Sequence, residues 1–250
     1  YVLTTILQNE ENMDIMYELV LTAVTAHWGL GFNRAILILR NEKERCFIVK
    51  HAIGQLSRLS ATTEWKRLPD LSRDEMIASV VHRENEPTEL HQQVAGMRFD
   101  FDSGDGRDLT DVIEKQEIYI SQDTGALPVR LREVLQISDE YVLVPVGDDN
   151  RLPGCIYADF NFTGQKIDRQ LARMLTTFVT HISSIVLSHR SRIHEVTEQT
   201  ERLKQLVKMQ REISLSTTGS NDAVKRTLLS IVESIVKLMN ADCGVIYTIK

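Results

Sequence analysis

The side chains best suited to chemistry lie in and around the strand-like run Gly154–Gly164. Asp159 interrupts this apolar run, where a carboxylate needs a partner or water. It could bind the donor groups of a small ligand beside Tyr157, but an ion pair with an arginine such as Arg34, or a role in holding a turn, is the favoured interpretation. Trp65 could stack on a planar ligand, while an anchor in the core is the simpler role. The candidate ligand contacts are Arg34, Trp65, Tyr157 and Asp159.

The seven histidines do not form a metal or cofactor signature. No HxxH or HxxxH pair occurs, and His189 and His194 lie five residues apart, roughly 140° around a helix. They cannot form one metal-binding face. Heme ligation by His51, His82 or His91 is a minor alternative. The sequence therefore carries no heme, bilin or metal signature, and it leaves the identity of any ligand open.

The cysteines and the known catalytic motifs give no sign of an enzyme. Cys46, Cys155 and Cys243 are widely spaced without a CxxC, which disfavours a zinc knuckle or a disulfide framework. Cys46 and Cys155 fall inside predicted strands, so buried thiols are favoured over bilin attachment or a redox pair. No GxSxG, HExxH, P-loop or GxGxxG occurs. The carboxylates of residues 100–108 lack the closing Glu of an EF-hand. We expect neither a catalytic residue nor a metal site.

Composition limits the partners of the chain. Its 250 residues, 42% of them hydrophobic and 26% charged, are enough for one ordinary core and part of another. A net charge of −6 disfavours nucleic acid, and no window holds the roughly 18 apolar residues of a membrane span. Free thiols fit a reducing cytoplasm. We expect a soluble, cytoplasmic fragment of a larger protein.

The elements that position the candidate residues form an α+β arrangement. Apolar periodicity predicts a helix over residues 13–28. Short apolar runs predict strands near 34–40, 46–53, 117–120, 141–147 and 154–161. Between them, residues 56–89 should hold two short helices that cover one face, and residues 99–107 read as a loop. The expected fold is an antiparallel sheet of about five or six strands flanked by helices from both ends of the segment.

A long helix is predicted over residues 168–215. Apolar residues recur there at alternating steps of four and three, and neither Gly nor Pro interrupts them, so a helix on the order of 70 Å is expected. Its seam would pair with a second copy of the chain in a parallel coiled coil; a lone solvated helix is the alternative. Polar seam positions would keep the coil switchable. The predicted dimer seam contains Leu175, Phe178, Ile182, Ile185, His189, Val196, Leu203 and Leu206.

The last residues repeat the beginning of the chain. A second amphipathic helix followed by Cys243-Gly-Val-Ile-Tyr-Thr-Ile249 aligns with the helix and first strand that lead to Ile36 and Leu37. We therefore expect three parts: a first sensory domain over 1–167, a connecting helix over 168–215, and the start of a truncated second domain over 216–250.

Several motifs in order resemble a GAF domain of the subtype found ahead of bacterial sensor histidine kinases. They are Gly29-Leu-Gly-Phe-Asn-Arg-Ala35, Ala52-Ile-Gly54, Val142-Leu-Val-Pro-Val146 and the run Gly154–Gly164. The resemblance implies five or six antiparallel strands, terminal helices on one face and a ligand cavity on the other. The family's usual Ala-Asp-Asn reads Ala158-Asp-Phe160 here, so no role of that Asn carries over.

These features predict a tandem GAF region of a signal-transduction protein. It would bind an unknown small ligand and relay the signal, through a homodimeric helix, to a downstream output domain. A histidine kinase is the expected parent, ahead of a cyclic-dinucleotide enzyme or a transcription activator. The alternative is a GAF-fold dimerisation or docking module without a ligand, whose cavity is filled by its own side chains.

Overall fold

The computed structural model describes residues 2–10, 12–61, 72–82, 86–101, 107–122, 127–137, 140–148 and 151–216. The chain forms two compact units, and the sheet with its helices belongs to the first, Tyr1–His189. Trp65 and the predicted second domain after residue 216 lie outside the described residues. None of the described helices is both long and apolar enough to cross a membrane.

One antiparallel sheet of six strands organises the first unit. In the order β3-β2-β1-β6-β5-β4 it contains Arg98–Asp100, Cys46–Gly54, Arg34–Asn41, Arg151–Asp159, Tyr141–Asp148 and Tyr119–Ser121. The α+β antiparallel fold and the five strands expected from the sequence are confirmed. The sixth, β3, lies where a loop was expected, because three residues that pair with Cys46–Ile48 are too few to show a period in the sequence.

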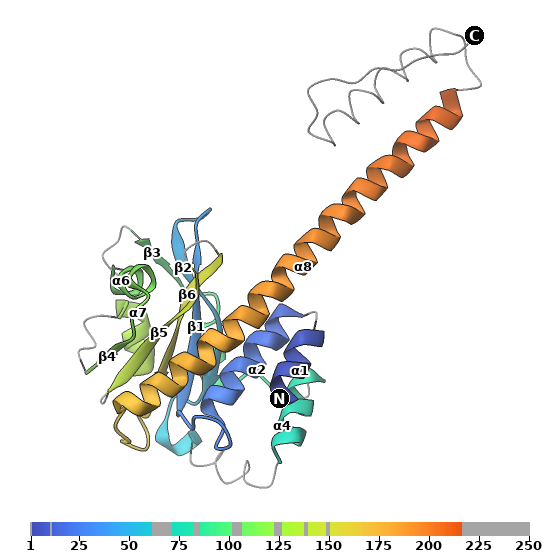
Figure 1. Cartoon of the computed structure of the whole chain (residues 1–250). Helices are drawn as coiled ribbons and strands as arrows, with labels where there is room; N and C mark the ends of the chain where they lie inside the picture. The colour runs from blue at the N-terminus through green and yellow to red at the C-terminus, as the bar shows by residue number, and fades with distance from the viewer. Residues whose placement is uncertain are drawn as a thin grey trace. The chain divides into compact units, whose positions relative to one another are not determined.

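The first face of the sheet carries helices from both ends of the unit. These are α1 (Val2–Asn9), α2 (Met13–Thr25), α4 (Arg73–Val81) and the first turns of α8 (Arg169–Ser216), which Figure 1 shows together on one side. Their apolar residues join alternate residues of the central strands in one buried cluster, including Ala35, Leu37 and Leu39 of β1, Val142, Val144 and Val146 of β5, and Ile156 and Ala158 of β6. The strict alternation follows from the period of two along a strand.

The second face carries shorter helices: α5 (Glu89–Val94), α6 (Arg107–Lys115) and α7 (Val129–Leu135). Figure 1 shows α6 and α7 on the side of the sheet opposite α2 and α8. A second buried cluster lies here, and it takes the other set of alternate strand residues, Ile36, Ile38, Tyr141, Leu143, Cys155 and Tyr157 among them. The two clusters together use nearly every residue of the central strands, which explains why these strands read as continuous apolar runs.

Side chains define several helix starts. Asn12 accepts hydrogen bonds from the backbone N–H groups of residues 14 and 15 at the start of α2. Ser72 and Glu75 form a reciprocal capping box at the start of α4. At the other end of α7, Gln136 adopts a left-handed conformation (φ 45°) that turns the chain toward β5.

Helix α8 begins where the sequence predicted, but its first turns pack on the chain's own sheet. Leu175, Ile182 and Ile185 are buried in the first-face cluster, and Phe178 packs against it. The same three–four spacing serves a helix on a sheet and a coiled coil, so the pattern could not separate the two. Leu175, Ile182 and Ile185 thus belong to the core of the first unit, and their part in a dimer seam stays a prediction. For His189, Val196, Leu203 and Leu206, whose side chains lie outside those described, a coiled coil stays a prediction.

Candidate functional site

Arg34 and Asp159 form a buried ion pair at the end of the central strands. They face each other directly in the β1–β6 register, and both side chains have 0% exposure. Arg34 Nε donates to Asp159 Oδ2 at 2.8 Å and to Oδ1 at 3.2 Å. Arg34 Nη2 lies 2.8 Å from Oδ2, although no hydrogen bond of good geometry forms there, so this contact is ionic. The favoured interpretation of Asp159, a pair with Arg34, is confirmed.

Two further donors and one carbonyl complete the surroundings of the pair. The hydroxyl of Tyr157 donates to Asp159 Oδ2, and the backbone N–H of Asn161 donates to Oδ1 at 3.0 Å. Arg34 Nη1 donates to the carbonyl oxygen of Leu135, the last residue of α7, at 2.6 Å. Burial, and then the negative charge of Asp159, raise the pKa of the Tyr157 phenol well above its ordinary value, so it stays a donor.

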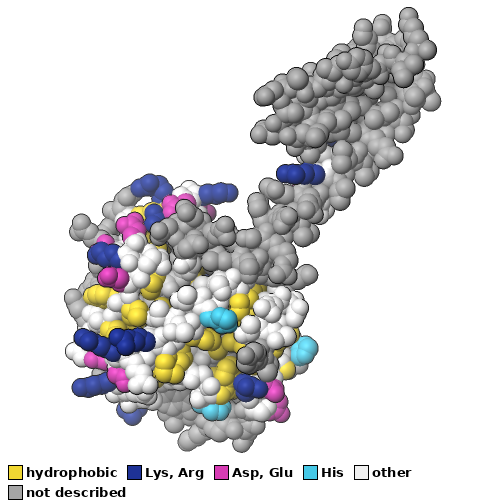
Figure 2. All heavy atoms as spheres, in the orientation of Figure 1, with side chains coloured by type: hydrophobic (Ala, Val, Ile, Leu, Met, Phe, Trp, Pro, Cys, Tyr) yellow, Lys and Arg dark blue, Asp and Glu magenta, His cyan; other side chains and the backbone are white. Residues whose placement is uncertain are grey.

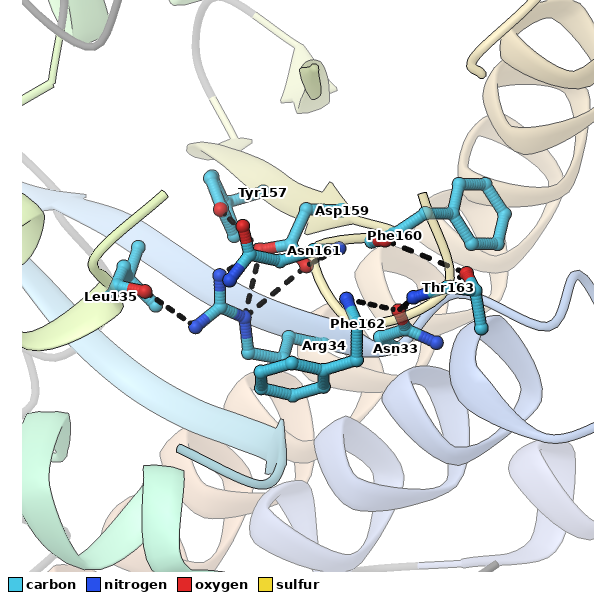
Figure 3. Close-up of polar contacts among 9 residues, drawn as sticks. All are labelled: Asn33, Arg34, Leu135, Tyr157, Asp159, Phe160, Asn161, Phe162 and Thr163. Atoms are coloured by element: carbon cyan, nitrogen blue, oxygen red, sulfur yellow. Dashed lines mark hydrogen bonds and ion pairs between the residues drawn. The ribbon is translucent and has the colours of Figure 1, made fainter. Parts of the chain in front are cut away.

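The turn that leads from β6 to α8 is fixed by the same corner of the sheet (Figure 3). Asn33 Oδ1 accepts the backbone N–H groups of Phe162 and Thr163 at 2.9 and 3.1 Å, and the hydroxyl of Thr163 at 3.3 Å. The ring of Phe162 lies 5.1 Å from the guanidinium carbon of Arg34. Asn33 lies in the motif Gly29–Ala35, but the sequence did not indicate this role, because its partners lie about 130 residues away.

The corner cluster, defined as Asn33, Arg34, Tyr157 and Asp159, joins two parts of the fold. One arm of Arg34 holds the C-terminal end of α7 on the second face, and Asp159 holds the first residues of the turn before α8. Every carboxylate oxygen already accepts at least two donors or cations. A ligand could bind Asp159 only by displacing one of them, so the geometry suits a mechanical link better than an open binding site.

The centre of the second face is filled by the protein's own side chains. The rings of Tyr141 and Tyr157 stack with centroids 5.7 Å apart, and both residues have 0% exposure. Leu131 and Leu135 of α7 are equally buried beside them. The sequence candidates Arg34, Tyr157 and Asp159 thus meet at one point, whereas Trp65 lies outside the described residues.

The two described thiols are placed for packing. Cys46 lies on β2 and Cys155 on β6, and β1 separates these strands, so the two are not cross-strand neighbours. Burial raises the pKa of Cys155 to about 12 and also raises that of Cys46. Neither group is a thiolate near neutral pH. In the described part of the chain, no group of three or more His, Cys, Asp or Glu side chains is arranged to hold a metal ion.

Comparison with known proteins shows likeness at the level of structure. No family model matches the chain, and no curated protein matches it in sequence. Residues 122 to 287 of a methyl-accepting chemotaxis protein match 78% of this chain and 98% of that one, with 14% identity and a TM-score of 0.50. A GAF domain/HD domain protein from Geobacter sulfurreducens has 12% identity and a TM-score of 0.47 over 74% and 97% of the two chains. The GAF domain of a two-component sensor histidine kinase from Bacillus halodurans has 9% identity and a TM-score of 0.45 over 74% and 99%. The match to the chemotaxis protein shows a shared fold.

Proposed function

We propose that the chain is a GAF-like sensory or regulatory region of a cytoplasmic signal-transduction protein, with α8 as its output element. The observation that carries the proposal is the corner cluster, which attaches the second-face helix α7 and the turn into α8 to one buried ion pair. A displacement of α7 on the second face would therefore be transmitted through Arg34 and Asp159 to the turn before α8. The ordered GAF-like motifs of the sequence support the same assignment, and a histidine kinase parent rests on analogy alone.

A homodimer is the proposed context for α8. An open groove lies beside its first turns. Leu30, Met174 and Phe178 line it together with polar residues that include Arg169 and Arg173. Figure 2 shows hydrophobic side chains gathered on one face of the first unit, with charged side chains around them. Exposed apolar surface of this kind is typical of an interface. Beyond His189 the heptad pattern continues in the sequence, so the second copy would meet the chain there as a parallel coiled coil.

The input to this module is proposed to be a small ligand on the second face. A specific observation favours the alternative, a dimerisation or docking module without a ligand: Tyr141, Tyr157, Leu131 and Leu135 already fill the centre of that face with 0% exposure. Under the alternative, the corner cluster would transmit the position of a docked partner instead of the presence of a ligand.

Native mass spectrometry of the purified 250-residue chain tests both proposals. A dimer that carries extra mass supports a ligand sensor, and a dimer without it supports the docking module. A monomer contradicts the coiled coil.

A pair of charge variants sharpens the dimer test. Leu203→Asp places a charge in the predicted seam and should abolish the dimer. Lys204→Asp changes the next residue, whose side chain is 66% exposed, and should leave the dimer intact. If both variants stay dimeric, the predicted seam around Leu203 does not form the interface.

A further inference from the structure

The outer edge of β2 is covered by a strand at its start and by side chains farther along. Among the described residues β3 pairs only with Cys46–Ile48, so the rest of β2 needs other partners for its outward backbone groups. The backbone N–H and C=O of Val49 bond to residues 97 and 96 at 3.0 and 2.9 Å. At Ala52 the partners are side chains of the α5 segment: the N–H donates to His91 Nδ1 at 3.3 Å, and the C=O accepts the hydroxyl of Thr88 at 3.4 Å.

The bond from Ala52 exists only when His91 is neutral. A ring nitrogen accepts a hydrogen bond only through its lone pair, so Nδ1 is unprotonated and the proton of the neutral ring sits on Nε2. Addition of a proton converts Nδ1 into a donor that points at the Ala52 N–H, itself a donor. The contact that holds α5 to the edge then becomes a repulsion.

A second histidine lies against the first. The rings of His51 on β2 and His91 on α5 are tilted by 57°, with centroids 4.4 Å apart. Around them are acidic groups: α2 contributes Glu18, whose Oε2 lies 4.0 Å from His51 Nε2, and the charge of Asp14. On α5, Glu89 accepts from Leu56 N at 3.4 Å and from Ser60 Oγ at 3.1 Å.

Burial has a larger effect on the pKa values of His51 and His91 than these carboxylates have. Burial, and then the neighbouring His91, together lower the pKa of His51 to about 4. Burial also lowers the pKa of His91, and this effect is larger than those of the hydrogen bond with the Ala52 backbone and the charge of Asp14, which raise it. Both rings are therefore neutral in the closed arrangement at neutral pH.

We propose that His51 and His91 form an acid-sensitive latch that holds α5 on the open edge of β2, so that uptake of a proton releases α5. Release uncovers the edge of β2 and the part of the second face beneath Leu90 and Val94, two buried residues of α5. This inference goes beyond the proposed function, because the input is a proton and no ligand is needed.

The sign and size of the effect follow from proton linkage. A histidine whose pKa is lower when closed than when open favours the closed state above its ordinary pKa, and this preference is lost as the pH falls toward the lowered value. For His51, an ordinary pKa of 6.5 and a closed value of about 4 raise the opening constant about fourfold at pH 6 and about thirtyfold at pH 5. Proton uptake by His91 adds to this.

Amide hydrogen exchange of the whole chain, corrected for intrinsic rates, tests the latch. In the wild type the protection of the Ala52 amide should fall about thirtyfold or more between about pH 7.5 and pH 5. Amides of the β1–β6 ladder should keep their protection.

The matched variant His51→Gln/His91→Asn should not respond, because Asn places an amide oxygen near the position of Nδ1 and neither amide titrates. The single variant His91→Asn, which changes less of the packing, should show a reduced response. Unchanged wild-type protection at pH 5, an equal loss in the double variant, or an equal loss throughout the β1–β6 ladder would each overturn the proposal.

Discussion

Replacement of one member of the Arg34–Asp159 pair should cost far more than replacement of both. Asp159→Leu leaves a guanidinium with 0% exposure and a single described acceptor, the Leu135 carbonyl, and it removes the acceptor of Tyr157 and Asn161. An uncompensated buried charge costs about 3–5 kcal/mol, and each orphaned donor adds about 1 kcal/mol. We expect Asp159→Leu to lower the free energy of unfolding by about 5 kcal/mol, and Arg34→Met by about 4 kcal/mol.

The double variant Arg34→Met/Asp159→Leu contains no buried charge. Its cost should be about 2–3 kcal/mol, mainly from the buried hydroxyl of Tyr157, which loses Asp159 as its acceptor. The two single effects therefore should not add. They sum to about 9 kcal/mol against about 2–3 kcal/mol for the double variant, so the coupling free energy between Arg34 and Asp159 should be about 6–7 kcal/mol.

Urea denaturation at pH 7, analysed as a double-mutant cycle, measures this coupling. Arg73→Met is the matched control, because Arg73 makes the same kind of contact with Asp74 at the surface, where the two side chains are 50% and 71% exposed. It should cost less than about 0.5 kcal/mol. Additive effects of Arg34→Met and Asp159→Leu, with coupling below about 0.5 kcal/mol, would refute the idea that the corner cluster is a tight buried link.

Three further outcomes are expected. Asn33→Ala should lower the free energy of unfolding by about 1–2 kcal/mol and raise amide exchange at Thr163, because the turn before α8 loses its acceptor. Asn33→Asp keeps an acceptor oxygen, so its stability and its exchange at Thr163 should stay near those of the wild type. Gly154→Ala should lower the stability measured in thermal melts by several kcal/mol. A Cβ atom would lie 2.4 Å from the backbone oxygen of Ile38 and so overpack the core. Cys155, with a pKa raised to about 12, should resist iodoacetamide at pH 8 until denaturant is added, as peptide mapping can show; rapid labelling of the folded chain would contradict its burial.

The strands could be predicted because both faces of the sheet are buried, which leaves a short apolar run in the sequence for each strand. Five apolar runs gave strands within a few residues of β1, β2, β4, β5 and β6, and the fold class followed from them. The predictions failed for short elements and for contacts between residues far apart in the sequence. Strand β3 is too short for a period, and α1 was not expected from its eight residues. Burial of Leu175, Ile182 and Ile185 on the sheet depends on a neighbour that a heptad pattern does not specify.

In the candidate site, too, some residues could be predicted from the sequence and others could not. Asp159 could be singled out because a carboxylate in an apolar strand needs a partner, and Arg34 was a reasonable partner because it opens another strand. The acceptor at Leu135 could not be predicted because it is a backbone carbonyl. Asn33 lies in a recognised motif, but its role depends on partners about 130 residues away. Likewise, His51 and His91 lie 40 residues apart and meet only because α5 folds back on the edge of β2.

The filled second face sets a condition on any input to this module. Tyr141 and Tyr157 occupy its centre, so a ligand or partner must move a covering helix to enter. Helix α7 is tied to Arg34 by a charge-assisted bond of 2.6 Å, whereas the α5 segment holds Ala52 through two neutral bonds of 3.3 and 3.4 Å. Charge-assisted bonds are about twice as strong as neutral ones, and the two neutral bonds are longer than the usual range of about 2.7–3.2 Å, so these polar contacts hold α5 less firmly than α7. Helix α7 would then respond to what enters, and its bond to Arg34 connects that response to the turn before α8.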